Sequence, residues 1–207
     1  VRKQETNIGD FCADALRSFT DADIAMVNGG GIRTNIKRGE ILFNDLYNVM
    51  PFGDMIATGT FYGEQLLDVL EFAVSALPAE AGTFMQVSGL RFTVDPDIPS
   101  PVMKDTETGM FSHVGEGERR VSQVEILDKQ SGEYKAVELS RQYTIATLDY
   151  LILEQGGAGI LSCVKPDSIY WGADIEVLRH YLESVLGGNI GSEYTQPQGR
   201  IIYKYFN

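Results

Sequence analysis

Residues 24–27 form a wholly apolar run, which is followed by Asn28, three glycines, Ile32 and Arg33. A short apolar run that ends at a turn signal is typical of a buried strand. Successive glycines allow positive φ angles and let the backbone approach another group closely. The chain is therefore expected to leave a buried strand through a very tight loop that delivers an arginine.

This loop suits an anion, because exposed backbone N–H groups and a forked guanidinium are both good partners for a phosphate or a carboxylate. A tight turn with a solvated Arg33 fits the segment equally well. The spacing matches neither a Walker A loop nor a dinucleotide fingerprint, so the segment alone leaves both interpretations open.

The charge of the chain restricts its partners. The sequence has 17 Lys and Arg against 29 Asp and Glu, a net charge of −12. Such a chain repels DNA and RNA on average, so we expect no nucleic acid polymer as a partner, while small anions remain possible. With 207 residues and 43% hydrophobic content it can bury a full core, and we expect one domain over residues 1–207.

Periodicity predicts interspersed helices and strands. Helices are expected at residues 5–19, 44–50, 63–77 and 174–186, with Thr6 and Asp174 as caps of the first and last. Strands are expected at residues 24–27, 56–62, 86–95, 121–127, 134–139, 142–148 and 199–205. Residues 96–120, rich in charge, Pro and Gly, read as a loop excursion. The fold class is α+β (mixed α/β), with helices packed on a twisted mixed sheet.

Several types of site have no support in the sequence. No apolar run reaches the roughly 18 residues that span a bilayer, and no signal-peptide core opens the chain, so no membrane span is expected. His113 and His180 have no partner at a metal-ligand spacing, and Cys12 and Cys163 read as buried thiols, although a disulfide between them remains open. We therefore predict no catalytic and no metal-binding residue in this chain.

Several segments together resemble the C-terminal, substrate-binding domain of the 5′-nucleotidase family, which includes UDP-sugar hydrolases and 2′,3′-cyclic-nucleotide phosphodiesterases. The matching segments are residues 2–10 (RKQETNIGD), 28–33 (NGGGIR), 50–54 (MPFGD), 86–92 (QVSGLRF), 143–159 and 199–201 (GRI). Their order and approximate spacing also match, so the resemblance covers nearly the whole chain and implies the fold of that domain.

The resemblance implies a phosphate site on the glycine loop, residues 28–33. Arg2 and Arg33 match arginines that contact phosphate, Asn28 matches an asparagine that contacts the base or sugar, and Gly30 lies in the loop between them. A guanidinium stays charged and binds phosphate in a bidentate manner, so both arginines fit this chemistry. A frayed terminus at Arg2 and a plain turn residue at Asn28 are the alternatives.

The resemblance also implies a base pocket with two aromatic walls, Phe52 on a Pro-Phe-Gly turn and Tyr150. A planar base between two rings gains about 1–3 kcal/mol per stacking contact. The chain departs from the family where an acidic residue binds the ribose hydroxyls, because Ala158 stands in that place. Two extra residues precede the glycines, and Glu154 could supply the missing carboxylate.

Family members hydrolyse phosphoesters at a two-metal centre in a separate N-terminal domain. The resemblance thus implies that divalent metals such as Zn²⁺ or Mn²⁺ belong to a metallophosphoesterase domain or chain outside this sequence, and that this chain alone is inactive. It implies nucleotide or nucleoside-like ligands, nucleotide catabolism, and a periplasmic, extracellular or cell-surface location. The alternative is a non-catalytic binding module for another small anionic ligand, for which Ala158 and the longer loop are the reasons.

Overall fold

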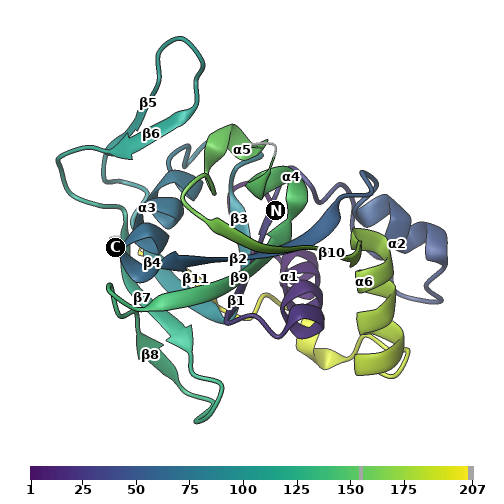
Figure 1. The fold of residues 1–207 in the computed structure, drawn as a ribbon. Coiled ribbons are helices and arrows are strands. Elements are labelled where there is room, and N and C mark those ends of the chain that lie inside the picture. The colour runs from purple at the N-terminus through teal and green to yellow at the C-terminus, as the bar shows by residue number, and fades with distance from the viewer. Residues whose placement is uncertain (154–155, 205–207) are drawn as a thin grey trace.

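A computed structural model describes residues 1–153 and 156–204, with only the backbone described at residues 169–171 (Figure 1). The helices are α1 (Asn7–Thr20), α2 (Phe43–Val49), α3 (Gly63–Ala73), α4 (Asp149–Ile152), α5 (Gly156–Gly159) and α6 (Asp174–His180), with a π-helical turn η1 (Tyr181–Val185) and a 3₁₀ turn η2 (Ser192–Tyr194). The strands are β1 (Ile24–Asn28), β2 (Met55–Tyr62), β3 (Met85–Ser88), β4 (Leu90–Val94), β5 (Val102–Lys104), β6 (Phe111–Val114), β7 (Val121–Leu127), β8 (Tyr134–Ala136), β9 (Gln142–Leu148), β10 (Lys165–Ala173) and β11 (Ile201–Tyr203).

The central sheet has five strands in the order β10-β2-β9-β1-β3. Strands β1 and β9 run parallel, and the other neighbours are antiparallel. All five residues of β1 are buried, as expected for a strand that is covered on both faces. Helix α1 packs on β1, β3 and β9, whereas α3 contacts β2 of this sheet and β7 of the second one. The prediction of helices on a mixed sheet is therefore confirmed.

The second sheet has four strands in the order β11-β4-β7-β8. The prediction of one strand over residues 86–95 was wrong, because β3 belongs to the first sheet and β4 to the second. The chain changes sheets at Gly89, whose φ is +70° and where a Cβ atom would overlap the carbonyl oxygen of Asp23. Only glycine tolerates both conditions, so this residue joins the two sheets.

A local side-chain cap determines where α1 begins, whereas long-range contacts determine where α3 ends. Thr6 caps α1 as predicted, its hydroxyl accepting from the N–H of Gly9 at 3.2 Å. Helix α3 ends at Ala73, four residues before the predicted end. The buried guanidinium of Arg120 accounts for this, since its Nη1 donates to the carbonyl oxygens of residues 74, 75 and 77 at 2.9–3.2 Å.

Three further segments differ from the sequence expectation. Residues 96–120 contain the β5–β6 hairpin, which projects from the body of the molecule in Figure 1. Strand β10 was not predicted, because Pro166, Asp167 and Ser168 weaken its pattern. It lies at the sheet edge and pairs with β2 through two register shifts. Helix α6 begins after an N-cap at Ala173, so Asp174 is its first residue rather than its cap.

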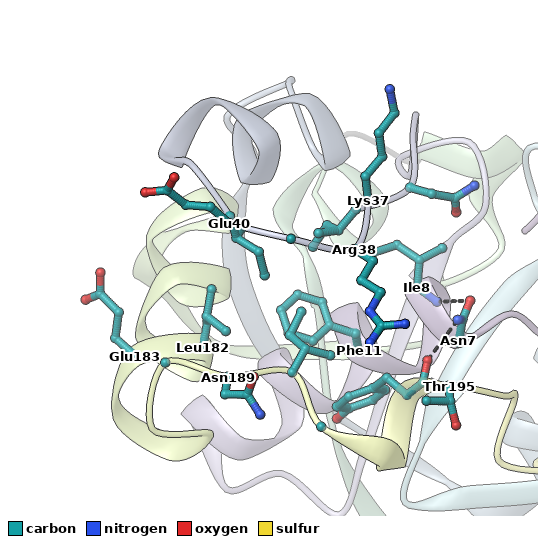
Figure 2. A pocket seen from close by; sticks show the side chains of 18 residues that line it. Asn7, Ile8, Phe11, Lys37, Arg38, Glu40, Leu182, Glu183, Asn189 and Thr195 are labelled. Carbon is teal, nitrogen blue, oxygen red and sulfur yellow. Dashed lines mark hydrogen bonds between the residues drawn. The ribbon is translucent and has the colours of Figure 1, made fainter.

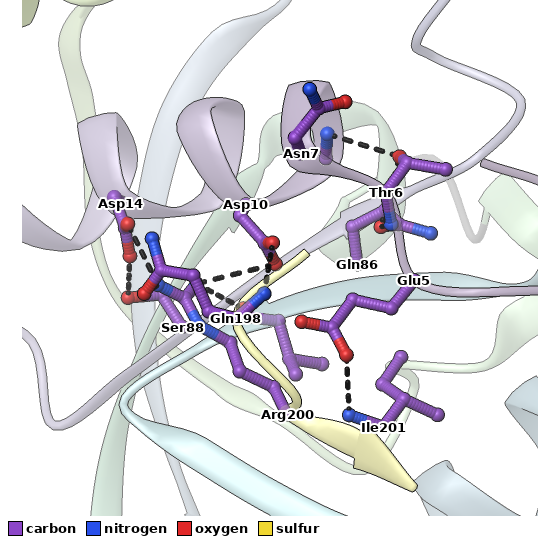
Figure 3. A network of polar contacts seen from close by, with 12 residues as sticks. Glu5, Thr6, Asn7, Asp10, Asp14, Gln86, Ser88, Gln198, Arg200 and Ile201 are labelled. Carbon is purple, nitrogen blue, oxygen red and sulfur yellow. Dashed lines mark hydrogen bonds and ion pairs between the residues drawn. The ribbon is translucent and has the colours of Figure 1, made fainter. Parts of the chain in front are cut away.

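A buried polar network ties the C-terminal segment to α1 (Figure 3). The guanidinium of Arg200 contacts Asp14 at 2.7 Å and Asp10 at 3.7 Å. The backbone N–H of Gln198 donates to Asp10 at 3.1 Å, and that of Ile201 donates to Glu5 at 2.8 Å. Two ends of the chain that are nearly 200 residues apart are thereby joined through one cluster of acids around one arginine.

Candidate functional site

The six predicted site residues come from segments that meet at one edge of the central sheet. Asn28, the last residue of β1, pairs with Met85, the first residue of β3. Strand β9 is parallel to β1, and its last residue, Leu148, pairs with Ile56 near the start of β2. Four segments therefore meet at this edge of the sheet. The glycine loop and the start of α4 leave the sheet here, and residues 51–54 and 81–84 lead into it.

The glycine loop is held by its own N–H groups. Those of Gly29, Gly30 and Gly31 donate to the carbonyl oxygens of residues 84, 82 and 28 at 2.7–2.9 Å. The expectation of exposed N–H groups at these glycines was therefore wrong, because tertiary contacts already occupy them. The absence of a side chain is required instead by close packing, since a Cβ atom at Gly29 would overlap the carbonyl oxygen of Val1.

Arg2 lies beside this loop. Its Cα atom would be 3.2 Å from a Cβ atom at Gly29, and its carbonyl oxygen accepts from the N–H of Ala81 at 2.9 Å. Two contacts thus hold the backbone, and the side chain is half-buried. The interpretation of Arg2 as a frayed terminus is not consistent with this packing.

Arg33 and Phe52 lie in one cleft of about 650 Å³, which is also lined by Thr34, Asn35, Lys37, Asp45, Asn48 and Pro51. The backbone N–H of Arg33 donates to the carbonyl oxygen of Val49 at 2.8 Å, and its Nη1 donates to that of Gly30 at 3.0 Å. The guanidinium carbon lies 5.8 Å from the centre of the Phe52 ring, which is a cation–π distance. Phe52 is 61% exposed, so this ring is not part of the core.

Asn28 faces into the glycine loop. It is only 7% exposed, and its Nδ2 donates to the carbonyl oxygen of Gly82 at 3.3 Å. Its Oδ1 is buried and has no hydrogen-bond partner among the described residues. In this conformation the side chain supports the loop, and one acceptor atom remains unused.

Tyr150 is the second residue of α4 and is 39% exposed. The Oδ1 atom of Asp149 accepts from the N–H groups of Tyr150 at 2.8 Å and Met55 at 3.0 Å. This carboxylate therefore fixes the start of β2, three residues after Phe52, to the start of α4. Tyr150 is not among the residues that line the cleft of Phe52, but both rings are accessible to solvent.

The segment that follows Tyr150 has an unusual backbone. Gly157, Ala158 and Gly159 have φ angles of 61°, 59° and 75°, so Ala158 adopts a left-handed conformation that Asp and Asn adopt more readily than Ala. Its methyl group offers no hydrogen-bond acceptor. Glu154, the suggested substitute for the missing acid, lies outside the described residues.

In the part of the chain that the structure describes, metal-ligating and thiol groups form neither a metal site nor a disulfide. Across residues 1–153 and 156–204, no three His, Cys, Asp or Glu side chains are placed to hold a metal ion. Cys12 and Cys163 are both free, and burial raises the pKa of each, that of Cys163 to about 11. In the same part of the chain, no helix is long and apolar enough to cross a membrane.

A larger groove of about 1180 Å³ lies between α1, residues 35–41 and the C-terminal segment (Figure 2). None of the six predicted residues lines it, although Asn35 and Lys37 line both the groove and the cleft of Phe52. Sequence reasoning missed Lys37 as a lining residue of the cleft. The signal was present, because Arg33, Lys37 and Arg38 form a basic stretch in an acidic chain.

Comparison with known proteins gives one consistent result. A family model described as "5′-nucleotidase, C-terminal domain" matches residues 1–165. A 5′-nucleotidase of Vibrio parahaemolyticus is 29% identical over 100% of this chain and 31% of its own length. A trifunctional nucleotide phosphoesterase protein of Bacillus subtilis is 28% identical over 97% of this chain and 12% of its own length.

The fold has a similar match among solved structures. The 5′-nucleotidase precursor from Thermus thermophilus superimposes with a TM-score of 0.79 and 27% identity, over 98% of this chain and 36% of that chain. The present chain therefore spans about a third or less of the length of the proteins it matches.

Proposed function

This chain belongs to the 5′-nucleotidase C-terminal domain family, and we propose that it recognises a nucleotide, holding the base and phosphate for a two-metal phosphohydrolase domain outside these 207 residues. The observation that carries the proposal is the pairing of Arg33 with Phe52 in one cleft, with a guanidinium and an exposed ring 5.8 Å apart. A cation beside an aromatic face suits a ligand that is both anionic and planar.

In this proposal Arg33 binds the phosphate. Its Nη1 donates to the carbonyl oxygen of Gly30, which orients the guanidinium while Nη2 and Nε remain to donate to a phosphate. No ion pair of Arg33 or Lys37 is found among the described residues, and these two cations outnumber Asp45, the one carboxylate that lines the cleft, in a chain of net charge −12. Arg2, whose backbone packs beside Gly29, is proposed as the second phosphate contact.

The base is proposed to stack between Phe52 and Tyr150. Both rings are exposed. Phe52 lies just before β2 and Tyr150 just after β9, at the same edge of the sheet, where Asp149 links the two segments. A Cβ atom at Gly30 would lie 3.0–3.3 Å from atoms of Asn28 and Gly82, so the missing side chain lets the loop pack closely beside the proposed site. Asn28 is proposed to contact the base or sugar through Oδ1, its buried and unused acceptor.

The divalent metals of the reaction do not fit the described residues of this chain, which gather no ligand set. We therefore assign them to a metallophosphoesterase domain or chain. The role of the present residues is to bind and orient the nucleotide, which lowers the entropic part of the barrier for a reaction carried out elsewhere. By family resemblance, we also propose a periplasmic, extracellular or cell-surface location, which fractionation of the producing cells tests.

A second candidate is a non-catalytic module that binds a different small anionic ligand. Ala158 favours it, because its methyl group stands where an acid would bind ribose hydroxyls, on a backbone that an aspartate would adopt more readily. Tighter binding of nucleotides than of other anions would support the nucleotide-recognition domain. Tighter binding of a non-nucleotide anion would support the non-catalytic module.

The test is calorimetric titration of the chain with AMP, adenosine and inorganic phosphate. We expect AMP to bind more tightly than either fragment. Arg33→Ala should lower the affinity for AMP toward that for adenosine, by roughly 1.5–3 kcal/mol for the loss of a hydrogen bond to a charged group. Arg38→Ala is the matched control, since this neighbouring cation does not line the cleft. Equal AMP affinity in the wild type and Arg33→Ala would exclude the phosphate role.

Activity gives a second test. The chain alone, supplied with Zn²⁺, Mn²⁺ or Mg²⁺, should release no phosphate from AMP or UDP-glucose. Metal-dependent turnover that co-purifies with this chain would refute the division of labour proposed above.

A further inference from the structure

We propose that Gly156 and Met110, neither of which is assigned a ligand contact, are positioning residues for the ring of Tyr150 and thereby set the affinity for the base. The effect on affinity rests on the proposed function, because the ligand is the same nucleotide. The position of the Tyr150 ring depends only on its packing against other described residues.

Gly156 supports one side of the Tyr150 ring. A Cβ atom at Gly156 would overlap the Cε1, Cζ and Cδ1 atoms of that ring, so the ring lies directly on the backbone of the glycine. Gly156 is buried, whereas Tyr150 is 39% exposed. The ring therefore contacts the protein at Gly156 while much of the Tyr150 residue remains accessible to solvent, and in this proposal the accessible part includes the face on which a base stacks.

Met110 supports the same segment from outside. A Cβ atom at Gly159 would lie 2.9 Å from the Cε methyl of Met110. Gly159 ends the run of three left-handed residues that begins at Gly157. From inside, a Cβ atom at Gly157 would lie 3.2 Å from the side chains of Leu151 and Ile160. The segment is therefore held between α4 and the β5–β6 hairpin.

The hairpin is itself anchored, so it can hold the segment in place. The Phe111 ring packs on Phe72 of α3 with 4.9 Å between ring centres, and the Lys104 ammonium lies 5.3 Å from the centre of the same Phe72 ring. The N–H of Asp105 donates to the carbonyl oxygen of Met110 at 2.9 Å and closes the turn. A contact path therefore runs from α3 through the hairpin to the support of Tyr150.

Gly156→Ala is the sharpest test, because Gly156 has no positive φ angle and alanine fits its backbone. Among the nearest atoms, the new methyl group meets only the Tyr150 ring, a side chain that can rotate away. We expect AMP to bind about tenfold more weakly, within the range of one lost stacking contact. Affinity for inorganic phosphate should be unchanged, and Gly156→Ala should have no further effect in a Tyr150→Ala background.

Met110→Ala should also weaken AMP binding, whereas Met110→Leu should keep most of the wild-type affinity for AMP. Met103→Ala, an exposed methionine of the same hairpin, is the control. The ring position is read separately by NMR, from the ring-current shift of the Gly156 Hα protons and its loss in Tyr150→Ala and Met110→Ala.

The outcomes separate the two proposals. A wild-type chain that binds no AMP refutes the proposed function, and the ring-current shift then decides the positioning claim alone. A wild-type chain that binds AMP no better than Gly156→Ala overturns the positioning proposal. An equal loss from Gly156→Ala with and without Tyr150 overturns it as well, because the effect then does not pass through the ring.

Discussion

Asp10→Asn should remove a pH dependence of stability that the buried polar network creates. Asp10 is fully buried, and it lies near Glu5 and Asp14 with Arg200 as the cation of the cluster (Figure 3). Burial raises the pKa of Asp10 to about 7. Arg200 at 3.7 Å lowers this pKa, and the neighbouring Glu5 raises it further. One oxygen of Asp10 and one of Glu5 have no hydrogen-bond partner among the described residues.

The sign follows from proton binding. Because the pKa of Asp10 is raised in the folded state, the folded chain binds a proton that the unfolded chain has already released above the usual pKa of 3.8. The stability contributed by that proton is complete below the unfolded value and is lost as the pH rises through about 7. Each unit between the two pKa values corresponds to about 1.4 kcal/mol. The ionisation of Asp10 should therefore lower the free energy of unfolding by about 3 kcal/mol between about pH 4.5 and about pH 8.

Urea denaturation at several pH values measures the effect. The free energy of unfolding of Asp10→Asn, minus that of the wild type, should rise by up to about 3 kcal/mol over the interval, because asparagine cannot ionise yet still accepts from Gln198. Asp128→Asn is the matched control, since hydrogen bonds from Ser131 lower the pKa of the half-buried Asp128 to about 2. Its curve should be displaced without a change of slope in this interval. Parallel curves for wild type and Asp10→Asn would refute the reasoning.

Three further changes have expected outcomes. Arg120→Ala should lower the free energy of unfolding by about 2–4 kcal/mol, because buried carbonyl groups at the end of α3 lose their donor, whereas Arg119→Ala, which removes an exposed ion pair, should cost under about 1 kcal/mol in the same denaturation assay. Phe52→Ala should weaken AMP binding by about 1–3 kcal/mol in calorimetry, and an unchanged affinity would exclude this ring as a wall of the base site. Ala158→Asp should create a preference of about 1–2 kcal/mol for ribose over 2′,3′-dideoxyribose, and a wild type that already rejects the dideoxy compound by about tenfold would assign the sugar contact to another group.

Local patterns predicted most elements well. Strand β9 has the predicted bounds, and α1 and β2 differ by one or two residues at their ends, because their apolar residues recur with the period of their structure. The failures have long-range causes. The strand break at Gly89 depends on a close approach to Asp23, and α3 ends where the distant Arg120 binds the carbonyl groups of the residues that follow it. Neither contact leaves a trace in the local pattern.

The candidate site divides in the same way. The sequence by itself identified the family and the departure at Ala158 and predicted the six site residues, because ordered motifs carry this information without coordinates. Only the tertiary structure decided that the N–H groups of the glycine loop are occupied, that Asn28 turns inward, and that Tyr150 rests on Gly156. Each of these depends on atoms brought together from separate segments, which a motif cannot specify. The sequence therefore determined which groups this edge of the sheet contains, and packing decided which of their atoms already have partners within the protein.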